Sequence, residues 1–328
     1  MGKGEILFEP DMVNVNLDKL KLDLCNVRFT HIREKLTEKQ MENEIWGEVD
    51  TRSLYDQIIS AKGLYEKPVI NSNFIVVEGN RRVVCLRRLK KLANTGKLPA
   101  FSKNYFDNIE CEMVPRTATQ DQINLYLAVE HVKGKKEWPT FNRAKMIYNL
   151  NKINNHSYDF LAKHLGMGKV TLIRYADVYE QTDRYGNLFK DEKDWYHKFT
   201  YFDELYKRKD LKNFRTLQQN VDKFAYWVHD GKFSDVRDVR RLANVLDDED
   251  ALKVLERANF REALQLVDNK NPALKSKEFK KIAGLIELIR SFPRRELIKT
   301  MQDPARRGIL ETLRKEIDSL LRDIDSMK

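Results

Sequence analysis

The sequence predicts an α+β N-terminal domain followed by two all-α parts, a helix-turn-helix domain and a helical C-terminal domain. Two observations support this fold class. Short β-branched runs alternate with helical segments up to about Pro115, and these runs are too short for a doubly wound sheet. From Gln120 onward the apolar residues recur at helical spacing. We place the domain boundaries at residues 1–118, 119–183 and 184–328.

The composition predicts a folded cytoplasmic protein with an anionic partner. Of 328 residues, 41% are hydrophobic and 34% are charged, which excludes global disorder. No apolar run approaches the length of a membrane span, so we expect no membrane partner. The formal net charge of +10 favours double-stranded DNA, and a bacterial protein of this kind would be nucleoid-associated. The three cysteines lack metal-site spacing and are expected to be buried and inert.

The N-terminal elements follow from alternating or helical apolar spacing between turn residues. Gly63 is expected to end the second helix as its C-cap residue, because glycine adopts the left-handed conformation without strain. In order, we expect a strand over Val13–Leu17, helices over Lys35–Trp46 and Asp50–Lys62, and strands over Pro68–Ile70, Phe74–Glu78 and Asn108–Val114.

The stretch Phe74–Leu89 predicts a strand, a tight turn and a helix. A β-branched run stops at Gly79, and Arg81 and Arg82 then open a segment with helical spacing. A glycine turn lets backbone N–H groups approach a ligand, and a helix start adds a partial positive charge to the two guanidinium groups. These features favour an anion with several oxygens, and phosphate is the first candidate.

The middle of the chain predicts successive helices. Thr119 is a candidate cap for a helix that runs through Glu130, and a further helix is expected over Asn142–Ile153. The most regular unit is Ser157–Tyr175, in which Ser157 can cap one helix and Gly166 can turn the chain into the next.

This unit has the pattern of a helix-turn-helix, and its exposed polar residues are candidate DNA contacts. Such side chains hydrogen-bond to phosphates and base edges. The alternative is an ordinary helical hairpin with a solvated basic face. The candidate DNA-binding residues are Lys163, Lys169, Thr171 and Arg174.

The last helix, after Pro304, carries an apolar stripe at steps of three or four residues. This spacing is typical of a two-helix seam, which would make the protein a homodimer. The alternative is that the stripe packs on its own domain. The stripe consists of Ile309, Leu313, Ile317, Leu320, Ile324 and Met327.

Several short motifs occur in an order that resembles a known family. They are Cys25-Asn26-Val27-Arg28, then Gly63-Leu64 and Pro68-Val69-Ile70, then Gly79-Asn80-Arg81-Arg82, then Glu130-His131-Val132-Lys133 and Pro139. This order resembles the ParB group, whose N-terminal domain has the ParB/sulfiredoxin fold and precedes a helix-turn-helix. The resemblance covers most of the first 180 residues.

The resemblance implies a nucleoside triphosphate, CTP or ATP, together with Mg²⁺. By resemblance, Glu130 would help to hold the magnesium ion, and the nucleotide-binding residues would be Arg28, Gly79, Asn80, Arg81, Arg82 and Glu130. Paired guanidinium groups bind phosphate, and Mg²⁺ prefers carboxylate and phosphate oxygens.

Three positions depart from the family pattern. Asn80 replaces a glutamate, His131 replaces an asparagine, and Gly134 stands where an arginine closes the second motif. The departures weaken the motif on its metal side, so binding is expected more strongly than hydrolysis.

We therefore predict a nucleotide-responsive DNA-binding protein. The alternative is an enzyme on the same fold, a nuclease or a nucleotide-dependent phosphotransferase or triphosphatase, in a phage or anti-phage system. The catalytic residues of that alternative are unknown, and the carboxylates near the motif that could serve metal-dependent cleavage are Glu78, Glu130, Glu110 and Glu112.

Overall fold

The computed structural model describes residues 8–24, 26, 29, 32, 34–96, 101, 103–132, 138–270 and 276–327. The chain forms two compact units. The first runs up to Lys207 and includes Gln218–Ala225, and the second contains Arg208–Leu217 and the chain from Tyr226 onward. The predicted boundaries at residues 118 and 183 both fall within the first unit, and the division into three domains stays a prediction.

The first unit begins with a mixed five-stranded sheet in the order β1-β5-β3-β4-β2. β1 is antiparallel to β5, with Val13 opposite Cys111. β3 is antiparallel to β4 and parallel to β5, and β2 is parallel to β4. The strands are β1 (Asp11–Val15), β2 (Lys21–Leu22), β3 (Val69–Ile70), β4 (Ile75–Glu78) and β5 (Ile109–Met113).

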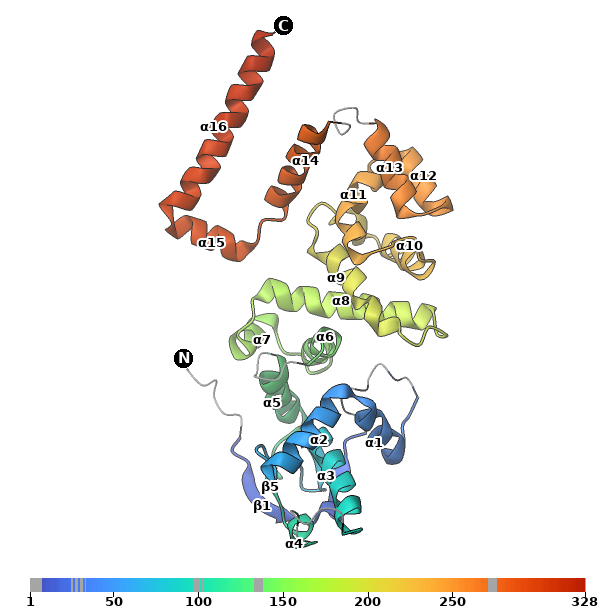
Figure 1. Ribbon diagram of the computed structural model, residues 1–328, viewed down its shortest axis with the longest axis vertical. Helices are drawn as coiled ribbons and strands as arrows, with labels where there is room; N and C mark the ends of the chain where they lie inside the picture. Colours follow the sequence, from blue (N-terminus) through green and yellow to red (C-terminus); the bar gives the residue numbers. More distant parts are fainter. Residues whose placement is uncertain are drawn as a thin grey trace. The chain divides into compact units, whose positions relative to one another are not determined.

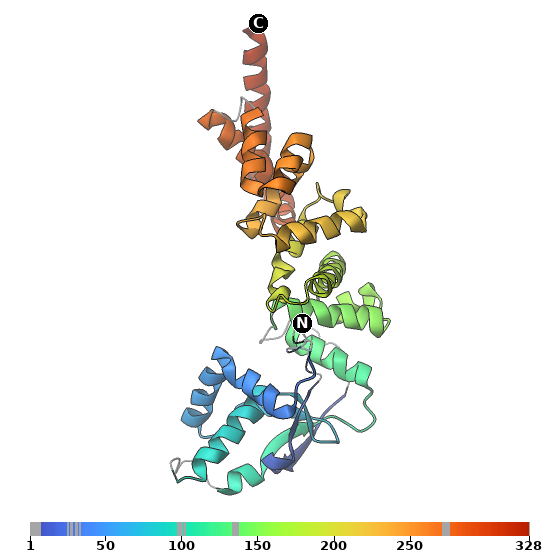
Figure 2. The same cartoon turned by 90° about the vertical axis from the view of Figure 1, so that its right-hand side faces the viewer.

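Helices cover both faces of this sheet. Successive strand residues point to opposite faces, and in β4 Val76 packs in one buried cluster while Val77 packs in another. The first cluster includes side chains from the helices between β2 and β5, which Figure 2 shows on one side of the strands. These helices are α1 (Glu38–Gly47), α2 (Val49–Ala61), α3 (Asn80–Ala93) and α4 (Lys103–Asp107).

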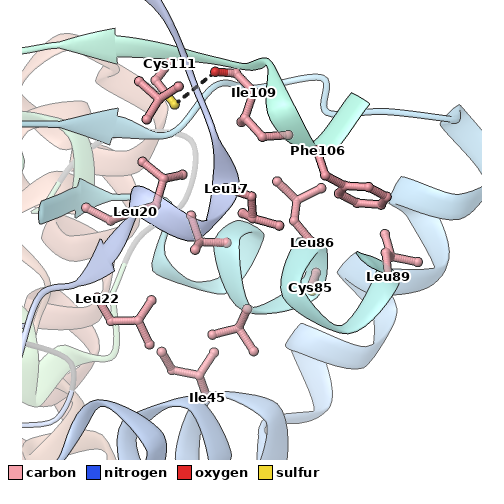
Figure 3. Close-up of a cluster of buried hydrophobic side chains, with 14 of the residues drawn as sticks. Leu17, Leu20, Leu22, Ile45, Cys85, Leu86, Leu89, Phe106, Ile109 and Cys111 are labelled. Atoms are coloured by element: carbon pink, nitrogen blue, oxygen red, sulfur yellow. Dashed lines mark hydrogen bonds between the residues drawn. The ribbon is translucent and has the colours of Figure 1, made fainter. Parts of the chain in front are cut away.

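The first cluster forms the core of the α/β part (Figure 3). Leu86 and Leu89 of α3 are fully buried there with Phe106 of α4. Cys85 and Cys111 are buried in the same cluster, as predicted, and burial raises the pKa of both thiols to about 12. Cys25 lies outside the described residues.

The second cluster joins the other face of the sheet to the helices that follow β5. Ile123 and Leu127 of the first of these helices pack there with Val114. The helices of this part are α5 (Gln120–Val132), α6 (Thr140–Tyr148) with a π-helical turn over Asn149–Ile153, α7 (Tyr158–Leu165), α8 (Lys169–Leu188) and α9 (Phe199–Lys207).

In the second unit, as far as it is described, the regular structure is helical (Figure 1). Short 3₁₀ turns occur over Phe214–Thr216 and Val236–Arg241. The helices that end in or belong to this unit are α10 (Gln218–His229), α11 (Leu242–Leu246), α12 (Glu249–Arg257), α13 (Phe260–Lys270), α14 (Lys277–Arg290), α15 (Arg294–Gln302) and α16 (Pro304–Ser326). Among the described helices, none combines the length and apolar character that a membrane span requires.

The predicted fold class is confirmed, with two local corrections. The first strand lies two residues earlier than predicted, because Leu17 turns into the core at the start of a 3₁₀ turn. The left-handed residue that ends α2 is Lys62, with φ 55°, and not Gly63. The N–H of Gly63 then donates to the carbonyl of Ile58, so the turn closes one residue earlier than the glycine suggested.

Candidate functional site

The end of β4 and the start of α3 border a cavity of about 400 Å³. Its wall also includes residues from α2, the end of α5 and the start of α6. The lining residues are Asn26, Phe29, Ile45, Asp50, Leu54, Glu78, Gly79, Asn80, Arg81, Arg82, His131, Trp138, Pro139 and Thr140. The four predicted residues of the Gly-Asn-Arg-Arg motif therefore share one cavity.

Gly79 is required by its conformation and by its surroundings. It precedes the first residue of α3 with φ +94°, in the left-handed region. A Cβ atom at this position would lie 2.9 Å from Arg82 Nη1 and 3.1 Å from Pro68 Cα. The first turn of a helix leaves its N–H groups without intrahelical partners, and the first turn of α3 lines the cavity. This arrangement suits an anion.

Asn80 uses its side chain within the protein. Its amide nitrogen donates to the carbonyl of Val76 at 2.9 Å, and its amide oxygen accepts from the N–H of Asp23 at 3.1 Å. The buried side chain thus fixes the start of α3 to β4 and to the segment after β2. The contact between Asn80 and phosphate stays a prediction. Because the side chain of Asn80 is used within the protein, the backbone N–H of Asn80 is the group that suits this contact.

The two arginines of the motif have different surroundings. Arg81 Nη1 lies 3.7 Å from a carboxylate oxygen of Asp50, whose side chain is 83% exposed. Arg82 is buried and forms ion pairs with Glu66 and with Glu78, the latter at 3.6 Å. The guanidinium of Arg81 therefore faces a solvated carboxylate, whereas that of Arg82 lies between two carboxylates.

The buried His131 pairs with the half-buried Glu78 in the cavity wall. Their Nε2 and Oε2 atoms are 2.9 Å apart, and the imidazole stacks on Trp138 with ring centroids 4.4 Å apart. Burial would raise the pKa of Glu78, but the hydrogen bond with His131 and the charge of Arg82 outweigh burial, so the pKa is lowered. The lowered pKa favours the ionised form of the Glu78 carboxyl at the edge of the cavity, and the hydrogen bond with His131 fixes its position.

Sequence reasoning did not select His131, Trp138 or Thr140 as site residues. His131 was visible only as a departure from a motif, and Trp138 only as the residue before Pro139. Nothing in the local pattern indicates that the end of α5 and the start of α6 meet the end of β4.

The predicted metal side of the site is less complete than the phosphate side. Glu130 is exposed on α5 and does not belong to the cavity lining. Arg28 lies outside the described residues. Among the residues that the structure describes, no group of three or more His, Cys, Asp or Glu side chains is arranged to hold a metal ion. Magnesium binding through Glu130 stays a prediction.

α7 and α8 are the two helices predicted over Ser157–Tyr175, and their identity as a helix-turn-helix stays a prediction. Ser157 caps α7 by accepting from the N–H of Phe160 at 3.2 Å, as predicted. Gly166 ends α7 in the left-handed region with φ 59°, and α8 begins at Lys169. Leu161 and Leu172 are fully buried in the second cluster, so the hairpin belongs to the core of the first unit.

The four candidate DNA contacts differ in exposure. Lys163 and Lys169 are exposed, and Lys169 Nζ lies 2.8 Å from Asp159 Oδ2. Thr171 is half-buried. Arg174 is half-buried as well, with its Nε 3.3 Å from Asp203 Oδ1. The expectation that α8 exposes all three of its polar candidates is therefore met fully only by Lys169, because α9 packs beside Arg174.

Comparison with solved structures gives distant likenesses. No protein-family profile matches the sequence. No curated protein matches it either. The structure is similar to the C-terminally truncated chromosome-partitioning protein ParB from Caulobacter crescentus, complexed to the centromeric parS site, with a TM-score of 0.36 and 11% sequence identity. That similarity covers 71% of this chain and 98% of the other.

Proposed function

We propose that this chain is a nucleotide-responsive DNA-binding protein. The observation that supports it most is the cavity in which Gly79, the start of α3 and two arginines meet. Its volume of about 400 Å³ lies in the range of small-molecule sites, roughly 300–1,000 Å³. One part of the lining is apolar, with Phe29, Ile45 and Leu54, and another part is cationic. A nucleoside triphosphate has an aromatic end and an anionic end that match these two parts.

The phosphates would bind at the first turn of α3, with Arg81 as the principal cation. Arg81 pairs with the carboxylate of Asp50, which is well solvated and can be exchanged for a ligand. The nucleotide is CTP or ATP by resemblance. A magnesium ion would supply further positive charge to the phosphates, with Glu130 as its expected ligand.

DNA would bind along the exposed basic side of the helix-turn-helix. Lys163 and Lys169 are exposed there and suit phosphate contacts, whereas Thr171 suits a hydrogen bond at the groove edge. Thr140 begins α6 and Pro139 is its N-cap residue, and both line the cavity. α6 packs along α8. A ligand that contacts the start of α6 would therefore favour one of two placements of α8, provided that the protein binds this ligand more tightly in one placement than in the other.

The apolar stripe of α16 supports self-association. α16 spans 23 residues, or about 34 Å at 1.5 Å per residue. No described residue of α16 is buried, and Ile317 and Leu320 are 45% and 51% exposed. Isoleucine at 317 and 324 alternates with leucine at 313 and 320, a pattern that favours parallel two-stranded coiled coils.

The decisive experiment for nucleotide binding is a calorimetric titration with CTP, ATP and GTP, with and without a DNA duplex. We expect Arg81→Ala to abolish nucleotide binding. Arg52→Ala is the matched control, because Arg52 is an exposed arginine of α2 outside the cavity lining. Unchanged nucleotide affinity in Arg81→Ala would remove the central claim.

The same proteins separate the binding protein from an enzyme. Incubation with plasmid, Mg²⁺ and each triphosphate gives a salt-sensitive complex without product if the chain only binds. Nicked DNA or repeated turnover of nucleotide would favour the nuclease or phosphotransferase alternative instead.

Self-association has its own test. Light scattering of the full chain is expected to give a dimer, and Ile317→Lys is expected to give a monomer, since it places a charge in the middle of the seam. A monomeric wild-type protein would contradict this part of the proposal.

A further inference from the structure

Arg82 lines the cavity, yet its guanidinium is already occupied by two carboxylates. Nη2 pairs with Oε2 of Glu66, and Nη1 lies 3.6 Å from Oε1 of Glu78. Only 10% of the Arg82 side chain is exposed. Glu66 itself does not line the cavity. The guanidinium therefore stands between the cavity and an acidic residue outside it.

The two carboxylates differ in how readily a ligand can displace them. Glu78 belongs to β4, and its second oxygen is held by His131 at 2.9 Å. Glu66 lies in the segment 62–68, which joins α2 to β3 without regular structure. Its side chain is 53% exposed, so its carboxylate can return to water at little cost. Glu66 is thus the exchangeable partner of Arg82.

We propose that Glu66 is an internal competitor of the phosphate group for Arg82. This inference rests on the proposed nucleotide site and adds a regulatory contact to it. A phosphate oxygen and the Glu66 carboxylate bear like charges and cannot share one guanidinium favourably. Phosphate binding at Arg82 therefore releases Glu66, and the closed Arg82–Glu66 pair opposes phosphate binding.

The release of Glu66 also changes the surface of the protein. Tyr65, its neighbour, is 87% exposed. The segment 62–68 loses the ion pair of Glu66 with α3 when Arg82 turns to the ligand. Binding at the two sites is linked. A partner that holds the segment 62–68 closed weakens phosphate binding by the same factor by which phosphate weakens the binding of that partner.

The test is a calorimetric titration of CTP and ATP into the full-length Glu66→Gln variant. Glutamine keeps the size of the side chain and removes the competing charge. We expect affinity to rise roughly fivefold, the factor that matches the upper end for a solvated ion pair. Glu110→Gln is the matched control. Glu110 is 58% exposed, lies outside the cavity lining and pairs at 3.2 Å with Lys67, the residue that follows Glu66 in the sequence.

Each outcome decides the proposal. Tighter binding in Glu66→Gln with unchanged binding in Glu110→Gln supports it. Equal or weaker binding in Glu66→Gln, while the wild type binds, overturns the competitor role and leaves the nucleotide site standing. If neither the wild type nor Glu66→Gln binds a nucleotide, the proposed function itself fails, and the competitor role fails with it.

Hydrogen exchange supplies a second readout that does not depend on the variant. Saturating nucleotide is expected to speed amide exchange in the segment 62–68 of the wild-type chain, because the tie to Arg82 is lost. Slower or unchanged exchange in that segment on nucleotide binding would contradict the release of Glu66.

Discussion

Gly79→Ala is expected to destabilise the first unit more than Gly96→Ala does. Gly79 has φ +94°, and an alanine forced into this region is strained by about 1–3 kcal/mol. Its Cβ would also lie 3.1 Å from the backbone of Pro68 and 2.9 Å from Arg82 Nη1. Arg82 cannot move aside without loosening its ion pairs with Glu66 and Glu78.

Together these effects lead us to expect a loss of about 2–4 kcal/mol in the free energy of unfolding. Gly96→Ala is the matched control, since Gly96 also has a positive φ, +75°, but no heavy atom lies within 4 Å of an added Cβ. Gly96→Ala should therefore lose only the backbone contribution, about 1–2 kcal/mol.

The assay is urea unfolding followed by tryptophan fluorescence. Of the four tryptophans in the sequence, Trp46, Trp138 and Trp195 belong to the first unit, so the signal reports mainly on that unit. If Gly79→Ala and Gly96→Ala lose the same free energy of unfolding, the contact with Pro68 and Arg82 carries no cost and the reasoning is refuted.

Three further predictions concern the pair of His131 and Glu78, the basic helix and the cysteines. His131→Ala is expected to cost roughly 1–3 kcal/mol in the free energy of unfolding, because it leaves the Glu78 carboxylate without its hydrogen bond. The folded-state pKa of Glu78 is lowered, so its contribution to stability is present above about pH 4.3 and is lost as pH falls through the folded pKa. In urea titrations at decreasing pH, the free energy of unfolding of His131→Ala should therefore fall less than that of the wild type. Lys169→Ala should weaken DNA binding, measured by fluorescence anisotropy, and should lower the free energy of unfolding by less than about 1 kcal/mol. Arg174→Ala should lower the free energy of unfolding more, because its partner Asp203 is only 14% exposed. Equal losses in the two variants would contradict the half-buried position of Arg174. The two described cysteines, Cys85 and Cys111, should resist iodoacetamide at pH 8 until urea unfolds the chain, since burial raises both pKa values to about 12. Rapid labelling of either of these two thiols in the folded chain would contradict their burial.

Local patterns predicted the elements that determine where the candidate site lies. The β-branched run before Gly79 predicted a strand, and the structure has β4 there, followed at once by α3. Ser157 and Gly166 predicted the limits of α7, because a side-chain cap and a left-handed turn act within one helical turn of their own residue. These signals are short-range, so the sequence alone carries them.

The apolar stripe of α16 shows how far such reasoning extends. Its spacing predicted a helix with one apolar face, and the structure has that helix from Pro304 to Ser326. The spacing left open whether the stripe packs on its own unit. The structure leaves the stripe largely exposed, which favours the seam between two chains, and self-association stays a prediction.

Contacts between residues far apart in the sequence could not be predicted from local sequence patterns. His131 lies 53 residues from Glu78, and Arg82 lies 16 residues from Glu66. Nothing in either local pattern selects these partners. A glutamate that is exposed to solvent and a glutamate that pairs with a guanidinium have no distinguishing local sequence. The partners are chosen only when the sheet and its helices pack.

The sequence by itself determined the chemistry of this protein: a glycine turn with two arginines at a helix start, a basic helical hairpin and an apolar C-terminal stripe. The tertiary structure decided which of those groups are available to a ligand. Arg81 meets a solvated carboxylate, whereas Arg82 is closed by Glu66 and Glu78. The physical reason is that helix and strand formation depends on neighbouring residues, whereas burial and ion pairing depend on which distant elements come into contact.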